Sequence, residues 1–213
     1  MEFDVEGNLA AVERSVSARE RDGRPARVVG LARRYATTPA ELWDAATTAD
    51  RIPRWFSPVD GELALGGRYQ LQGNAGGLVT ACEPRSHLAL TWEFGGDLSW
   101  LEAWVRHDGP DRARLTLTHT SLVTEHWEQY GAGATGVGWE LILLGLEMHL
   151  ADPEAPKPDE VAFVTSADGR AFIVGSSAAW AEAAIAAGEE PGAARAAAAR
   201  TTAFYTGEAV EPG

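Results

Sequence analysis

The residues with the most chemical potential lie on two alternating segments of the chain. The stretch RARLTLTHT at 112–120 predicts a β-strand with Leu115, Leu117 and His119 on one face and threonines on the other. A histidine that faces an apolar interior could orient a polar group of a ligand or act as a base. The alternative is a core histidine bonded to a nearby carbonyl, and the pattern favours that alternative without excluding the first.

Glu102 is the second candidate, because it lies between Trp100 and Trp104 on one face of the expected strand 98–107. On a concave face, a carboxylate held between two indoles would have a raised pKa and could act as an acid. The alternate residues from Leu101 to Val105 make a better interior row, so we expect Glu102 on the outer face, where it is solvated.

No other set of residues predicts catalysis, a metal or a cofactor. The sequence lacks Gly-x-Ser-x-Gly, its single cysteine is Cys82, and its histidines have no metal-ligand spacing. The stretch GAGATG at 131–136 matches a dinucleotide-binding pattern, but no strand directly precedes it. We expect these glycines to form a loop ahead of a helix whose N-terminus could accept an anion.

The bulk properties narrow the class of protein. The 213 residues carry a formal net charge of −13, with 45% hydrophobic residues. Such an acidic chain argues against binding to nucleic acids and to anionic membrane surfaces, which need local positive potential. The sequence has no apparent signal peptide and no apolar run near the roughly 20 residues that span a bilayer. We therefore expect a cytoplasmic protein without a membrane partner.

The elements that must position these residues form an antiparallel meander and a long helix. Strands are predicted at 67–73, 77–84, 87–94, 98–107 and 112–120, after a β-rich start near Val28. A short helix is predicted at 39–47, with Thr38 as its N-cap and Pro39 in its first turn. A second short helix is expected around 49–55, and the long helix from about Thr135 to Leu150.

The two ends of the chain are predicted to be separate from this core. Residues 1–27 read as a polar N-terminal arm with a short helix and a turn at Asp22-Gly23. The long helix is apolar nearly all round, so it needs a second partner. We expect the alanine-rich extension 151–213, with helices at 169–187 and 191–206, to pack on its Leu141, Leu144 and Met148 face. A homodimer through that face is the alternative.

Several motifs in this order resemble a known family. They are TPAELWDAATTADRIPRWFSP (38–58), LGGRY (65–69), CEPRSHLALTW (82–92), LTLTHTSL (115–122) and GW (138–139). Together they resemble the Activator of Hsp90 ATPase homologue 1-like family of the START-like superfamily, over roughly residues 28–150. The resemblance implies an α+β, helix-grip (START-like, Bet v 1-like) domain: an antiparallel sheet wrapped around a long C-terminal helix.

The resemblance also implies where a ligand would bind. The two short helices would close one end of the sheet, with Trp43 anchoring the first in the core. Trp55 and Phe56 would either line a cavity between sheet and long helix or belong to a plain core, and the sequence leaves both open. The predicted ligand-contact residues are Trp55, Phe56, Tyr69, Leu71, Trp92, Leu117, His119, Trp139 and Leu143.

The function expected from these features is non-covalent binding of a small hydrophobic or aromatic ligand. A cyclase or dehydratase that uses a cavity histidine or glutamate is the alternative. A chaperone-activating role is disfavoured, because the 27 polar N-terminal residues cannot replace the separate domain that the eukaryotic activator uses to engage the chaperone.

Overall fold

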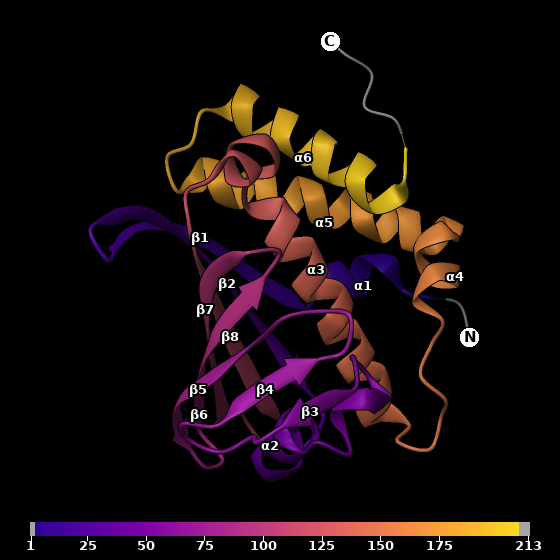
Figure 1. The fold of residues 1–213 in the computed structure, drawn as a ribbon. Helices are drawn as coiled ribbons and strands as arrows, with labels where there is room; N and C mark the ends of the chain where they lie inside the picture. Colours follow the sequence, from indigo (N-terminus) through magenta and orange to yellow (C-terminus); the bar gives the residue numbers. More distant parts are fainter. Residues whose placement is uncertain (1–2, 209–213) are drawn as a thin grey trace. The chain divides into compact units, whose positions relative to one another are not determined.

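The structure of the chain is a computed structural model that describes residues 3–208 (Figure 1). Its elements are α1 (Val5–Ala10), β1 (Val12–Arg21), β2 (Arg24–Tyr35), α2 (Pro39–Thr47), the 3-10 helix η1 (Ile52–Arg54), β3 (Val59–Gly61), β4 (Arg68–Leu71), β5 (Gly76–Glu83), β6 (His87–Phe94), β7 (Asp97–His107), β8 (Ala113–Leu122), α3 (Glu125–Ala151), α4 (Glu160–Thr165), α5 (Ala167–Ala186) and α6 (Pro191–Thr206).

The fold is the predicted α+β helix-grip type. Its eight strands have the order β1-β2-β8-β7-β6-β5-β4-β3, and the long helix α3 follows the last of them in the chain. The residues form two compact units. The sheet unit comprises Ala32–Ser121 and Ile142–Lys157, and the terminal unit comprises the chain up to Leu31, Leu122–Leu141 and the chain from Pro158 on. The domain boundaries near residues 27 and 150 remain a prediction of where the family domain begins and ends.

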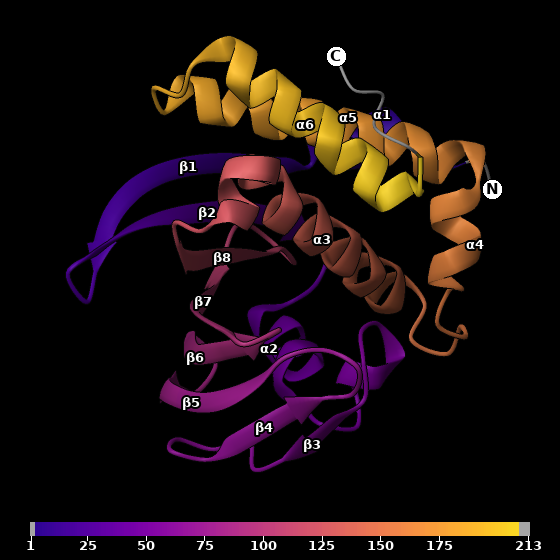
Figure 2. The same cartoon turned by 45° about the horizontal axis from the view of Figure 1, so that its top comes forward.

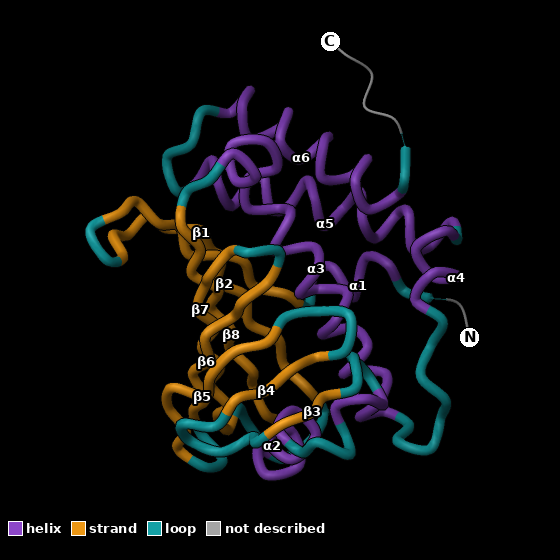
Figure 3. The backbone as a smooth tube through the Cα atoms, viewed as in Figure 1, coloured by secondary structure: helices purple, strands orange, loops and turns teal. Residues whose placement is uncertain are grey.

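The sheet unit contains the predicted meander, from β4 to β8, and a short strand β3 that was not predicted (Figure 3). Each neighbouring pair along it is antiparallel, and β6 keeps one register with β7 over its whole length. Helix α2 has the predicted bounds, and the Thr38 hydroxyl accepts the hydrogen bond from the Glu41 amide, as expected for an N-cap. The second short helix is only the single turn of η1, with Pro53 inside it.

The N-terminal arm differs from its prediction. Residues 12–21 form strand β1 rather than a short helix, which instead occupies Val5–Ala10. Val12, Arg14 and Val16 are each less exposed than the residues beside them. Such an alternation is the period of a β-strand. The turn at Asp22-Gly23 is confirmed, and both residues have positive φ (52° and 73°), as a tight hairpin of the type I′ class requires.

In the terminal unit, α3 begins ten residues earlier than predicted and breaks at Gly131. Gly131 has φ 60° and ψ −155°, a conformation essentially restricted to glycine. The expected glycine loop is therefore wrong: one glycine breaks the helix, and Gly133 and Gly136 are helical.

The C-terminal helices of the terminal unit form a pair, joined by a tight turn at Gly188 (Figure 2). Ala181, Ala184 and Ala194 make its small buried core. The pair packs on α3 at its glycines: a Cβ added to Gly136 would lie 2.1 Å from the Trp180 ring, and one added to Gly133 would lie 3.1 Å from Thr201. The packing of the extension on the Leu141, Leu144 and Met148 face stays a prediction.

Candidate functional site

One face of the sheet unit gathers the apolar side chains of four strands. The register aligns Val79 of β5, Leu90 of β6, Leu101 of β7 and His119 of β8 in one row across the sheet. Directly paired residues of an antiparallel sheet point to the same side. His119 therefore lies on the inner face, as predicted, and it is only 7% exposed.

Strand β6 is the exception on this inner face. Val79, Leu101 and His119 are buried, whereas Leu88, Leu90 and Trp92 on the same face are only partly buried. Large apolar side chains on a covered face are normally buried. The inner face is thus less tightly covered along β6 than along β7 and β8.

His119 belongs to a chain of hydrogen bonds that links β8, β7 and β6. Its Nε2 lies 2.8 Å from the Ser99 hydroxyl oxygen, which lies 3.1 Å from the Trp92 carbonyl oxygen. Serine has one hydroxyl proton, so Ser99 either donates it to the Trp92 carbonyl and accepts from His119, or donates it to Nε2; the tautomer of His119 decides which. Burial lowers the pKa of His119 to about 4, so the ring is neutral at pH 7. The Trp92 ring meets it edge-on, with centroids 5.9 Å apart.

Trp55 and Phe56 lie together at the turn after η1. Their rings stack with centroids 5.9 Å apart, and both residues are buried (8% and 9% exposed). The Trp55 indole N–H donates to the Ala45 carbonyl at 2.9 Å, which ties this turn to α2. A Cβ at Gly145 would lie 2.7 Å from the Trp55 carbonyl oxygen, so glycine allows α3 to approach the turn closely. A cavity-lining role for these two rings stays a prediction, with a plain core as the alternative.

The other predicted contacts in the sheet unit are buried side chains. Tyr69 and Leu71 of β4 are each 5% exposed, Leu117 is 4% and Leu143 of α3 is 2% exposed. The Tyr69 hydroxyl donates to the Thr91 carbonyl at 2.8 Å, so its proton already has an acceptor. Burial raises the pKa of Tyr69 above its ordinary value, and the residue stays a neutral phenol.

The two remaining tryptophans of the prediction belong to different units. Trp139 is 7% exposed, and it belongs to the terminal unit. Trp43 is only partly buried, so it is not the core anchor of α2. Leu42 and Ala45, both fully buried, anchor that helix instead.

The outer face of the meander carries Glu102, as predicted. It is paired with Ala89 and Thr118 across the sheet, and its carboxylate lies 3.5 Å from His87 Nε2. The His87 ring in turn stacks on Trp104, with centroids 5.1 Å apart. This half-exposed contact shares no face with His119, so the two candidate residues do not form one site.

A buried ion pair in the terminal unit was not predicted from the sequence. Glu140 of α3 is fully buried and receives two hydrogen bonds of 2.7 Å from the Arg14 guanidinium and one of 2.6 Å from the Trp180 indole. The pair joins β1, α3 and α5. The sequence signal for this pair is the alternation in residues 12–21, which places Arg14 on the less exposed face of a strand.

The described residues contain neither a metal-binding cluster nor a membrane-spanning helix. Among residues 3–208, no three histidine, cysteine or acidic side chains cluster as a metal site would require. Within the same range, no helix has the length and apolar character needed to cross a bilayer.

Comparison with known proteins identifies the family. The family model "Activator of Hsp90 ATPase homolog 1-like protein" matches residues 36–151, more than half of the chain. The crystal structure of CalU16 from Micromonospora echinospora is 30% identical, with a TM-score of 0.64 over 81% of this chain and 98% of that chain.

More distant structures share the fold. PFC0360w, an HSP90 activator from Plasmodium falciparum, is 22% identical, with a TM-score of 0.52 over 58% of this chain and 96% of that chain. DynU16, from the dynemicin biosynthetic locus, is 19% identical, with a TM-score of 0.53 over 62% of this chain and 50% of that chain. No curated protein gives a match. The motifs, the helix-grip fold and the family match agree: this chain belongs to the Activator of Hsp90 ATPase homologue 1-like family.

Proposed function

We propose that the inner face of the sheet unit binds a small hydrophobic or aromatic ligand without forming a covalent bond. The observation that carries the proposal is the contrast along one row of the sheet. Leu90 of β6 is only partly buried, while its neighbours Val79 and Leu101 are buried. Binding an apolar molecule over β6 would remove this exposed apolar surface from water.

Trp92 and His119 would set the specificity of such a site. The partly buried Trp92 indole offers an aromatic surface, and the neutral His119 ring beside it offers polarity without charge. A neutral aromatic or polyketide-like molecule fits this combination. An anionic head group at His119 would gain no ion pair there.

Binding is favoured over catalysis by the weak basicity of His119. Burial lowers the pKa of this ring to about 4, and a base with so low a pKa removes protons poorly near pH 7. Glu102, the other candidate for a cyclase or dehydratase, lies on the outer face of the sheet. The relative that is an HSP90 activator is 22% identical, a level that supports the shared fold alone.

The test uses the full chain and a matched pair of tryptophan variants. A panel of aromatic polyketides, fatty acids and the dye anilinonaphthalene sulfonate is screened by thermal shift, and hits are titrated calorimetrically. We expect Trp92→Ala on the inner face to weaken binding at least about tenfold, because aromatic anchors dominate binding energy. Trp104→Ala on the outer face is the control. Equal losses in both variants, or no stabilising compound in the panel, would reject the proposal.

A further inference from the structure

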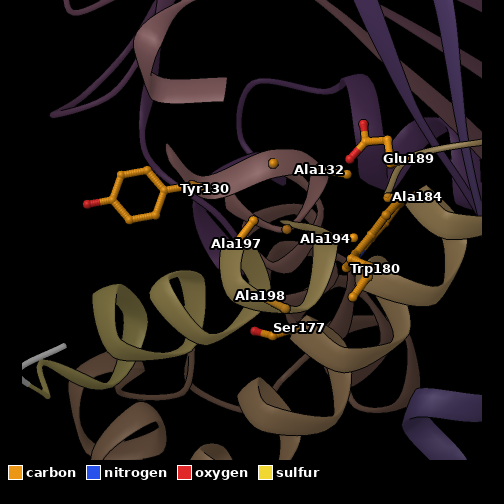
Figure 4. A pocket seen from close by; sticks show the side chains of 12 residues that line it. Tyr130, Ala132, Ser177, Trp180, Ala184, Glu189, Ala194, Ala197 and Ala198 are labelled. Carbon is orange, nitrogen blue, oxygen red and sulfur yellow. The ribbon is translucent and has the colours of Figure 1, made fainter. Parts of the chain in front are cut away.

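A small pocket in the terminal unit lies beside the break in α3, between α5 and α6 (Figure 4). Alanines and the Trp180 ring line it, and its volume is about 10 Å³. A space of that size holds one water molecule at most and excludes an organic ligand. A cluster of charged and titratable side chains at the end of α3, in the sheet unit, offers more chemistry.

Arg51 is the centre of this cluster, and it lies between α2 and the single turn of η1. One nitrogen of its guanidinium lies 2.7 Å from the Glu41 carboxylate, and another lies 2.9 Å from the Asp44 carboxylate. The nitrogen that contacts Glu41 also lies 3.1 Å from Nε2 of His149, in the last turn of α3. Arg51 therefore joins α2, η1 and the end of α3.

This geometry fixes the protonation state of His149. A guanidinium has donors but no acceptor, and it keeps its charge throughout. Nε2 must therefore accept the hydrogen bond from Arg51, so the ring is neutral and carries its proton on Nδ1. His149 is only 5% exposed. A proton added to Nε2 would remove the acceptor and place two cations side by side where little water screens them.

The surrounding charges favour the neutral ring. Besides its guanidinium partner, His149 faces Arg54 of η1 and Glu41 of α2. Burial and the two arginines lower the pKa of His149 from its ordinary value of 6.5, and the opposing Glu41 carboxylate does not outweigh them. On α3 itself, the Glu147 carboxylate lies 3.6 Å from Arg33 of β2. The contact is therefore complete above pH 6.5 and is lost as the pH falls below that value.

The turn that follows η1 carries Trp55 and Phe56, and we call it the aromatic turn. It lies against α3 at Gly145, where a Cβ would be 2.7 Å from the Trp55 carbonyl oxygen. The Arg54 guanidinium and the Lys157 ammonium also donate to main-chain carbonyls between the turn and the chain that follows α3, at 3.3 and 2.5 Å. Neither cation titrates near neutral pH, so the response of this boundary to acid falls to the histidine.

We propose that the contact between His149 and Arg51 is an acid-sensitive latch that holds the aromatic turn against the end of α3. Protonation of Nε2 breaks this hydrogen bond and lets the turn separate from α3. Glu41 and Asp44 still hold Arg51, so the turn stays attached to α2. The latch lies within the sheet unit, and it does not depend on the ligand proposed for the inner face.

The test follows the full chain by NMR from about pH 7.5 to about pH 4.5. The reporters are the ring protons of His149 and the nuclear Overhauser contacts between Gly145 and Trp55. We expect these contacts to lose at least about half of their intensity with the same midpoint as the ring, below pH 6.5. The Trp55 indole N–H, which donates to the Ala45 carbonyl, should stay protected from exchange, because the turn remains on α2.

Two glutamine variants separate the latch from other effects of acid. His149→Gln offers Arg51 an acceptor that takes up no proton, so the contacts between Gly145 and Trp55 should persist at low pH. His107→Gln is the matched control, because His107 is an exposed histidine of β7 in the same unit. This control should behave like the unmodified chain.

Three results would overturn the latch. The first is a His149 ring that titrates while the contacts between Gly145 and Trp55 keep their intensity. The second is the same loss of contacts in His149→Gln as in the unmodified chain, which would assign the response to another group such as His119, whose pKa is about 4. The third is loss of indole protection at the same midpoint, because the sheet unit would then unfold as a whole rather than release one turn.

Discussion

Replacing Glu140 with glutamine is the sharpest test of how the terminal unit is held together. The substitution keeps the shape of the side chain and an oxygen that can accept from Trp180. It removes the negative charge that the Arg14 guanidinium contacts twice at 2.7 Å. Arg14 is only 11% exposed at its side chain, so its charge would remain buried without a counter-charge.

The magnitude follows from this burial. Breaking a buried ion pair by removing one partner costs about 3–5 kcal/mol of unfolding free energy. For a chain of this size that corresponds to a fall in melting midpoint of about 6–20 °C. Glu182→Gln is the control in the same unit, because its partner Arg195 and Glu182 are both 63% exposed. An exposed pair contributes at most about 1 kcal/mol.

The assay is urea unfolding followed by circular dichroism, with hydrogen exchange of β1 and α5 to identify the transition of the terminal unit. This distinction matters because two compact units need not unfold together. The double variant Arg14→Met, Glu140→Leu should recover much of the lost stability, since it leaves no unpaired charge. If Glu140→Gln costs no more than Glu182→Gln, the ion pair does not hold the unit together and the reasoning is wrong.

The remaining predictions concern His119 and the helix contacts. The folded-state pKa of His119 is about 4, against an ordinary value of 6.5. Its contribution to stability is therefore complete above pH 6.5 and is lost as the pH falls toward 4, by up to about 3 kcal/mol. His119→Asn should flatten the stability profile in that window, and an unchanged slope would contradict the assignment. Gly136→Ala should destabilise by about 1–3 kcal/mol despite alanine's helix propensity, because the new Cβ would lie 2.1 Å from the buried Trp180 ring. Denaturant titration checks this, and a stabilised variant would mean that the two helices are not in close contact.

The sequence predicted those parts of the fold that depend on neighbours along the chain. The N-cap Thr38, the alternation that puts His119 inside and Glu102 outside, and the turn at Asp22-Gly23 are all local patterns, and the structure confirms them. The failures were contacts between distant residues. One failure was local instead: residues 12–21 have the alternation of a strand, but their polar composition obscured it.

The same contrast between local patterns and distant contacts holds for the candidate site. The sequence identified His119 as the titratable residue of the inner face but not its partner Ser99, whose hydroxyl oxygen lies 2.8 Å from Nε2. It marked Trp43 as the anchor of α2, where Leu42 is the buried residue. Local periodicity tells which residues share a face, but it does not tell which side chain reaches which partner across the sheet.

By itself, the sequence determined the helix-grip class and the family, because periodicity, caps and ordered motifs are properties of neighbouring residues. The tertiary structure alone decided that Arg14 and Glu140, 126 positions apart, form one buried pair. It also decided that α3 breaks at Gly131, where α5 and α6 pack. Burial of a charge or a break in a helix is stable only when distant groups satisfy it, and those groups come together only in the folded chain.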